Sequence, residues 1–182
     1  MKTIDLNSII TTNYSSPIED LLLGSYEENL VLCDWKFRKM RKSIDSRICS
    51  ALNANMVEGE NEVLSETKKQ LDEYFSNKRE EFDLPLKLIG TNFQKSVWNQ
   101  LLEINFGKTI SYLKLSQNLG NEKAIRAVAS ANGANAVSII VPCHRVIGSD
   151  GSLVGYAGGV SAKKYLLKLE GAEIQNQLNL FT

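Results

Sequence analysis

The sequence predicts an α/β (α+β) fold in two small domains, an α/β domain over residues 1–89 and a mostly helical domain over residues 90–182. A length of 182 residues and a hydrophobic content of 43% are sufficient for a core in each domain. Strand patterns dominate the first part, whereas short helices bounded by capping residues and glycines dominate the second. The charge also divides, since residues 1–89 contain 12 Lys and Arg against 16 Asp and Glu, and residues 90–182 contain 9 against 5. The second domain is therefore the better candidate to face a polyanion.

Two strands and one helix are predicted in the first domain. Leu21–Tyr26 and Leu30–Trp35 have the composition of strands and are joined by a polar turn. Apolar residues recur at helical spacing over Val63–Phe75, which predicts an amphipathic helix. Leu84–Ile89 is predicted to be a short strand or a linker. The basic run Lys36–Lys42 favours a solvated surface, with phosphate contact as the alternative.

The composition also excludes several classes of protein. No apolar run is long enough to span a membrane, and no signal peptide is indicated. The three cysteines, Cys33, Cys49 and Cys143, are odd in number and far apart, which argues against a disulfide framework and for the reducing cytoplasm. Their spacing matches no zinc ribbon or finger, so we expect neither a metal nor a cofactor.

Four helices are predicted in the second domain. The first begins at Thr91, with Gln94 completing a capping box. Two short helices follow, one over residues 111–119 and one capped by Asn121 that ends near residue 132. A pair joined by a glycine-containing turn is typical of a helix-turn-helix. A last helix, capped by Ser161, ends near residue 171. The apolar face of the first helix is predicted to consist of Phe93, Val97, Trp98, Leu101 and Leu102.

The second helix of the predicted helix-turn-helix has an unusual face of small residues. Small side chains allow a backbone to approach another surface closely, and Arg126 is the one long cation among them. The alternative is an alanine-rich packing face with Arg126 at its rim. The small residues are Ala124, Ala127, Ala129, Ser130 and Ala131.

The strongest chemical signal is the tetrad Pro142–Arg145, which follows an apolar run. Ile139–Val141 predicts a buried strand, from which Pro142 would direct Cys143 at a defined angle. Residue His144, the only histidine of the chain, is adjacent. On an extended chain neighbouring side chains point to opposite faces, so Cys143 and His144 need not touch. A thiol is an effective nucleophile only as a thiolate, which a nearby imidazole can generate.

Val141–Ile147 resembles the active-site signature of the O6-alkylguanine-DNA alkyltransferases, also called methylated-DNA–protein-cysteine methyltransferases. Further motifs extend the resemblance from Gly90 to Gly171. It implies a ribonuclease H-like first domain and a winged-helix-like helix-turn-helix in the second. The implied function is direct, irreversible transfer of an alkyl group from O6-alkylguanine in double-stranded DNA to Cys143. The protein would flip the damaged nucleotide out of the duplex, act once and be a monomer that contacts no membrane.

The resemblance also implies roles for individual residues in catalysis. His144 would act as the base through a water molecule, with Glu170 fixing its tautomer. Tyr112 would assist departure of the guanine. Asn135 would brace the helix of small residues against the loop that carries Cys143.

The implied contacts with DNA and with the base come from three further segments. Arg126 would fill the gap left by the extruded nucleotide, on a helix that lies in the minor groove. The backbone carbonyls of Cys143 and Val146 would receive the exocyclic amine of guanine, and Tyr156 would provide a wall for stacking. The other implied DNA contacts are Ala127, Ala129, Ser130 and Tyr112. The other implied substrate contacts are Ala157, Gly158 and Arg145.

This chain departs from the family pattern at three positions, because Ala136 and Ser138 stand where relatives have proline and Ala157 where some have serine. The first two departures would loosen the connection between Asn135 and the tetrad. Two other classes of function stay open at this point. A DNA-binding module without catalysis would have no use for Cys143, and a thiol-based hydrolase or redox protein would react transiently. The sequence does not indicate the range of alkyl groups accepted or any activity on O4-alkylthymine.

Overall fold

The computed structural model describes residues 7–173, which form two compact units. Of the described residues, 7–91 and Ala136–Ile140 form the N-terminal unit. The C-terminal unit contains Asn92–Asn135 and residues 141–173. The return of five residues to the N-terminal unit, directly before the tetrad, was not indicated by the sequence. Among the described residues, no helix combines the length and the apolar character needed to cross a membrane.

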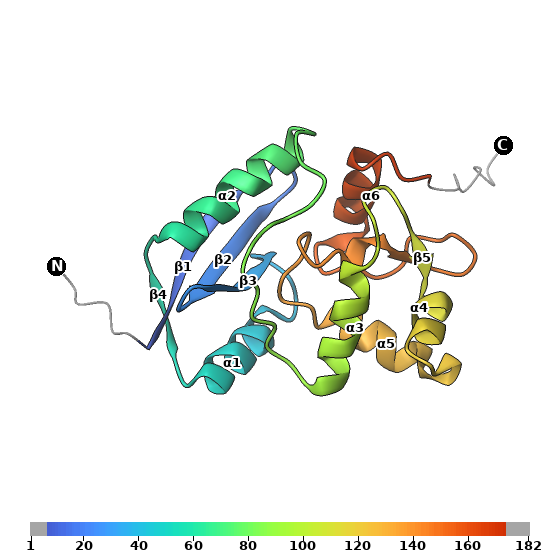
Figure 1. Ribbon diagram of the computed structural model, residues 1–182, viewed down its shortest axis with the longest axis horizontal. Coiled ribbons are helices and arrows are strands. Elements are labelled where there is room, and N and C mark those ends of the chain that lie inside the picture. Colours follow the sequence, from blue (N-terminus) through green and yellow to red (C-terminus); the bar gives the residue numbers. More distant parts are fainter. Residues whose placement is uncertain (1–6, 174–182) are drawn as a thin grey trace. The chain divides into compact units, whose positions relative to one another are not determined.

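The N-terminal unit is built on a mixed sheet of four strands in the order β3-β2-β1-β4 (Figure 1). β1 (Ser8–Ser15), β2 (Asp20–Tyr26) and β3 (Asn29–Trp35) are antiparallel neighbours, whereas β4 (Asn55–Glu58) pairs with β1 in parallel. The predictions of β2 and β3 are confirmed, including the turn, in which Glu27 has a φ of 53°.

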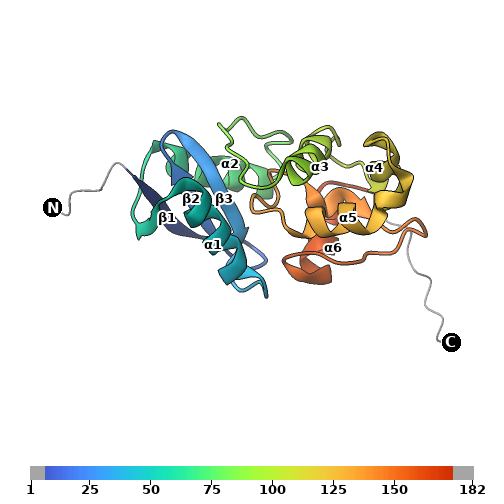
Figure 2. The same ribbon diagram turned by 90° about the horizontal axis from the view of Figure 1, so that it is seen from below.

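Two helices cover the sheet from opposite sides, as Figures 1 and 2 show for α1 (Arg41–Leu52) and α2 (Glu62–Phe75). α2 confirms the predicted helix, and the Asn61 side chain caps it by accepting a hydrogen bond from the Leu64 amide (3.0 Å). α1 buries Ile44 and Ile48 against a cluster that includes residues of β1 and β3. The basic run obscured α1, because its apolar residues are sparse.

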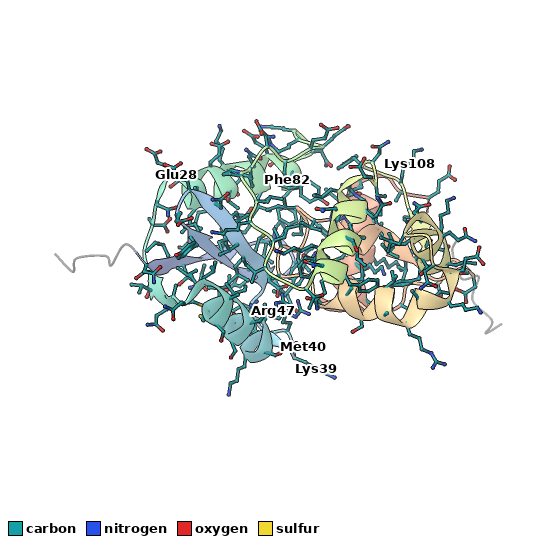
Figure 3. The ribbon with its side chains drawn as sticks, turned by 60° about the horizontal axis from the view of Figure 1, so that its bottom comes forward. Glu28, Lys39, Met40, Arg47, Phe82 and Lys108 are labelled. Carbon is teal, nitrogen blue, oxygen red and sulfur yellow. The ribbon has the colours of Figure 1, made fainter. Side chains whose placement is uncertain are left out.

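The basic run Lys36–Lys42 is only partly a solvated surface, which corrects the prediction. Arg38 is 8% exposed, and its Nη1 donates to Oδ2 of the buried Asp34 (2.8 Å). Arg41 donates to the same oxygen (2.9 Å). Lys39 and Met40 are exposed in the loop before α1 (Figure 3). The two arginines turn inward because a buried carboxylate requires charged partners.

The helices of the C-terminal unit are α3 (Asn92–Leu102), α4 (Tyr112–Asn118), α5 (Ile125–Gly133) and α6 (Gly159–Leu169). α3 confirms the predicted first helix, but only Val97, Trp98 and Leu101 of its predicted apolar face are buried. Phe93 and Leu102 are 42% and 43% exposed, which corrects that part of the prediction. α5 packs against α3 and α4, and Figure 2 shows α5 beside α3.

The predicted helix-turn-helix is present as α4 and α5. Ser111 caps α4, and Asn121 caps a short 3-10 turn, Glu122–Ala124, that leads into α5. The predicted cap at Ser161 is wrong, because α6 begins at Gly159 and Gly158 is its N-cap. Gly159 has a φ of 84°, which glycine adopts without strain as the chain enters the helix. Two short parallel strands, β5 (Ile110–Ser111) and β6 (Val146–Ile147), join the start of α4 to the end of the tetrad.

Candidate active site

The apolar run before the tetrad is buried but is not a strand, which corrects the prediction. Ile139 has a φ of 72°, a left-handed conformation that a β-branched residue rarely adopts. The Ile140 amide donates to the Ser138 carbonyl (2.9 Å), and the Cys143 amide donates to the Val141 carbonyl (2.8 Å). Tight local bonds of this kind replace the ladder of a strand. Cys143–Arg145 then forms a 3-10 turn, so the alternation of an extended chain does not apply to Cys143 and His144.

Cys143 lies in a buried polar contact with Asn135. Cys143 is 2% exposed, and Asn135 is also buried. Asn135 Nδ2 lies 3.2 Å from Cys143 Sγ and donates to the Val141 carbonyl (2.9 Å). One amide therefore fixes both the sulfur and the backbone two residues before it. An N–H that faces sulfur favours the thiolate over the thiol.

His144 and Glu170 form a buried pair, the pairing that the resemblance implies. His144 Nε2 lies 2.7 Å from Glu170 Oε1, and Glu170 ends α6 as its C-cap. Complete burial lowers the pKa of His144, although Glu170 opposes this shift, so the imidazole is neutral at neutral pH. Burial raises the pKa of Glu170, but hydrogen bonds and charges from His144 and Arg145 outweigh it and lower the pKa to about 2. Among the described residues, His144 Nδ1 has no hydrogen-bond partner.

Arg145 and Gly107 complete the surroundings of Glu170. Arg145 Nε donates to Oε2 (2.9 Å) and Nη2 to Oε1 (3.1 Å), while Nη1 donates to the Ile104 carbonyl. The Gly107 amide donates to Oε2 (3.2 Å). All three guanidinium nitrogens thus have protein partners. A substrate contact by Arg145 stays a prediction without a structural contact to support it.

Tyr112 and Asn132 lie close to the Cys143 backbone. Asn132 Nδ2 lies 3.3 Å from Tyr112 Oη and 3.4 Å from the Cys143 carbonyl oxygen. Burial and the proximity of Cys143 raise the pKa of Tyr112 to about 12, so its hydroxyl is protonated at neutral pH. Sequence reasoning noted Asn132 only as the end of a helix. The missed signal was a polar side chain one turn after the buried Val128.

Lys163 is a second residue that sequence reasoning missed. Its side chain is fully buried in α6, and Nζ donates to the carbonyls of Val146 (2.6 Å) and Val154 (2.9 Å). Burial lowers the pKa of Lys163 to about 8, although Cys143 opposes this shift. A lysine among the apolar residues of the last helix was the available signal. Its two bonds join the end of the tetrad to the glycine-rich loop.

The loop Val154–Gly158 carries the remaining predicted base contacts. Tyr156, Ala157 and Gly158 are each half-buried. The Tyr156 ring meets the His144 ring edge to face, with centroids 6.3 Å apart. The loop therefore contacts the histidine of the tetrad through the Tyr156 ring.

The exposed face of α5 contains Arg126, Ala127, Ala129 and Ser130, whereas Val128 points inward. The predicted small-residue face is thus open to solvent at these positions. Ala131 belongs to the buried side instead, where its carbonyl accepts a hydrogen bond from Trp98 Nε1 (2.8 Å). In residues 7–173 no group of three or more His, Cys, Asp or Glu side chains is arranged to hold a metal ion.

Two family models match almost the whole chain. One is described as 6-O-methylguanine DNA methyltransferase, DNA binding domain, and matches residues 92–172. The other is described as 6-O-methylguanine DNA methyltransferase, ribonuclease-like domain, and matches residues 9–88. The expected ribonuclease-like first domain is thereby confirmed.

Relatives of known sequence and structure agree with these models. The methylated-DNA–protein-cysteine methyltransferase of Methanosarcina acetivorans is 46% identical over 159 residues, which is 87% of this chain and 96% of the relative. The crystal structure of Mycobacterium tuberculosis OGT in complex with DNA superposes with a TM-score of 0.76 at 38% identity, covering 89% of this chain and 92% of that one. The Mycobacterium tuberculosis O6-methylguanine methyltransferase superposes with a TM-score of 0.74 at 37% identity, covering 96% and 99%.

Proposed function

This chain belongs to the O6-methylguanine DNA methyltransferase family, and from that premise we propose that Cys143 is the sulfur that accepts the alkyl group. The protein is a methylated-DNA–protein-cysteine methyltransferase that binds DNA and repairs O6-methylguanine directly, by transfer to an active-site cysteine. The observation that carries the assignment is the contact of Asn135 Nδ2 with Cys143 Sγ, next to the only histidine of the chain. Cys33 is buried in β3, where burial and Asp34 raise its pKa.

His144 is the proposed base. If Nε2 carries the proton that Glu170 accepts, Nδ1 is left as a buried acceptor without a protein partner among the described residues. This nitrogen can take the Cys143 proton through one water molecule, the arrangement that the family resemblance implies. Glu170 stabilises the imidazolium that forms, which is the role of the acid in a triad. The low pKa of Glu170 keeps it ionised for that purpose.

The transfer itself is a displacement at the alkyl carbon. A sulfur–carbon bond forms as the carbon–O6 bond breaks, and the electron pair of that bond leaves with the guanine. Tyr112 is proposed to donate a hydrogen bond or its proton to the departing base. The product is a thioether, which water does not cleave under these conditions, so each molecule acts once.

Binding of the base and of the DNA is proposed to use the remaining predicted residues. An O6 substituent in a stacked duplex cannot be reached in line by a buried thiol, so the nucleotide has to leave the stack. Arg126 is the proposed side chain that fills the vacated position, and its exposed neighbours Ala127, Ala129 and Ser130 permit close approach of α5 to DNA. The carbonyls of Cys143 and Val146, with the loop that contains Tyr156, Ala157 and Gly158, are the proposed contacts for the guanine.

We further propose that residues 1–89 and 90–182 are separate domains and that the protein is a cytoplasmic monomer acting on double-stranded DNA. The two family models, which meet between residues 88 and 92, support the division. The need for a reduced acceptor thiol supports a reducing compartment.

The test is intact mass spectrometry after incubation with duplex DNA that contains one O6-methylguanine, followed by peptide mapping. We expect one added methylene per protein, located on Cys143, with no second turnover. Cys143→Ser should remain unmodified, whereas the matched control Cys49→Ser should be modified like the parent. Modification at Cys33 or Cys49, or release of the methyl group, would contradict the assignment. Treatment with a chelator should leave the rate unchanged.

A further inference from the structure

We infer that Asn132 is a positioning residue that aims the hydroxyl proton of Tyr112 at the departing base. The inference rests on the proposed function, because it concerns how the leaving group is assisted. Asn132 is 4% exposed, and its Nδ2 lies between Tyr112 Oη (3.3 Å) and the Cys143 carbonyl oxygen (3.4 Å).

The orientation of the amide follows from the Cys143 carbonyl. A carbonyl oxygen only accepts hydrogen bonds, so the amide atom that faces it has to be the nitrogen. The reverse orientation would set two acceptors against each other and leave the NH2 group without the Cys143 acceptor, which is unfavourable for buried polar groups. The backbone of the acceptor residue therefore fixes which way Asn132 points.

The orientation of the amide then fixes the Tyr112 proton. Tyr112 Oη accepts from the Asn132 nitrogen, so its own O–H cannot point toward Asn132 and is free to donate elsewhere. The hydroxyl also stays protonated, since the pKa of Tyr112 is raised to about 12. A phenol held this way can donate to the base as the carbon–O6 bond breaks, without first breaking another donor bond.

The other end of the Asn132 amide, Oδ1, supports the same inference. It is buried and has no hydrogen-bond partner among the described residues. The amide is therefore not held by a partner on both sides, as a purely structural asparagine would be, and the contacts of its nitrogen determine its direction. Because both nitrogen contacts are long, the effect of each is moderate, and we expect a rate change of several-fold rather than a complete loss.

The experiment is a double-mutant cycle with free O6-benzylguanine. The rate of Cys143 benzylation is measured by mass spectrometry under single-turnover conditions. Asn132→Ala should slow the parent about five-fold. In the Tyr112→Phe background the same change should slow the reaction less than two-fold, because the proton that Asn132 aims is absent. Asn118→Ala, an exposed asparagine at the end of α4, is the matched control and should leave the rate unchanged.

A second substrate separates positioning from general support of the fold. O6-benzyl-8-bromoguanine has a less basic leaving group, so its departure depends less on a proton donor. The defect of Asn132→Ala should shrink with this substrate, whereas a distorted site would slow both substrates equally. Asn132→Asp keeps the size of the side chain but replaces the donor by an acceptor, and should react at least as slowly as Asn132→Ala.

The outcomes are distinct. Equal slowing by Asn132→Ala in both Tyr112 backgrounds and with both leaving groups would overturn the inference, as would a parent-like rate of Asn132→Asp. Absence of methylation of Cys143 by duplex O6-methylguanine in the parent would instead overturn the proposed function.

Discussion

The prediction with the largest structural effect concerns Glu170→Gln. The change removes the negative charge that the buried guanidinium of Arg145 faces. It also weakens the hydrogen bond between position 170 and His144. The pKa of Glu170 falls from an ordinary value of 4.5 to about 2, which corresponds to about 3 kcal/mol in favour of the ionised form. Breaking a buried charge pair on one side costs a similar amount, about 3–5 kcal/mol. A loss of about 3 kcal/mol should lower the unfolding midpoint by roughly 6–12 °C for a chain of this length.

The stabilisation of the folded protein by Glu170 depends on pH. The pKa of Glu170 is depressed in the folded protein, so its stabilisation is fully present above the unfolded pKa and is lost as the pH falls from about 5 toward about 2. The pKa of His144 is also depressed, by burial, so protonation in the unfolded state destabilises both proteins as the pH falls below about 6.5. The difference between the parent and Glu170→Gln is therefore the quantity that reports on Glu170.

The assay is thermal unfolding of the parent and Glu170→Gln between pH 3 and 8. We expect a constant difference in midpoint above about pH 5 and a smaller difference at pH 3. Glu173→Gln removes an exposed carboxylate three residues further on and should behave like the parent. Equal midpoints of parent and Glu170→Gln at pH 7, or a difference that does not change with pH, would refute the reasoning.

Three further perturbations test other parts of the structure. Arg126→Ala should slow repair of duplex O6-methylguanine about ten-fold, which corresponds to about 1.4 kcal/mol. The rate with free O6-benzylguanine should be unchanged. Equal slowing of both reactions in single-turnover assays would show that Arg126 supports the fold instead. Gly107→Ala would place a Cβ 2.7 Å from the Glu170 carbonyl oxygen at a φ of 70°, so its unfolding midpoint should fall well below that of Gly120→Ala, which has a similar φ of 76° but open space. Similar midpoints for these two variants would show that the close approach is relieved at little cost. Asp34→Asn should lower the free energy of unfolding in urea by about 3 kcal/mol, because it removes the buried carboxylate that Arg38 and Arg41 both contact, although Arg41 keeps Asp45. A loss below about 1 kcal/mol would contradict the importance of that buried network.

Much of the chemistry could be predicted from the sequence because it depends on local order. The tetrad, the helix-turn-helix and the final helix each have a pattern that a few adjacent residues define. The pairing of His144 with Glu170 was accessible in the same way, through the resemblance and the unfavourable position of an acid at a helix C-terminus. The strands β2 and β3 were predictable because a polar turn separates two apolar runs.

The misses have a common physical cause, which is that the presence or absence of long-range contacts overrides the local pattern. Ile139–Val141 has the composition of a strand, but no strand within residues 7–173 pairs with the run, and the chain forms tight turns there instead. Arg38 belongs to a basic run, yet Asp34 draws it inward. Asn132 and Lys163 are polar residues on otherwise ordinary helices, and only the fold shows that backbone carbonyls near Cys143 are their partners.

The segment Ala136–Ile140 shows how this chain compensates for the prolines that it lacks. The Ala136 carbonyl accepts a hydrogen bond from the Cys33 amide (2.9 Å), and the Ser138 hydroxyl donates to Asp34 (3.0 Å). These bonds hold the segment on β3 in place of the restricted φ that proline would provide. They also account for Ile139, whose left-handed backbone costs about 1–3 kcal/mol and persists only where its surroundings determine it. The serine thus supplies a hydrogen bond that proline cannot make, whereas the expectation of a loosened connection stays a prediction.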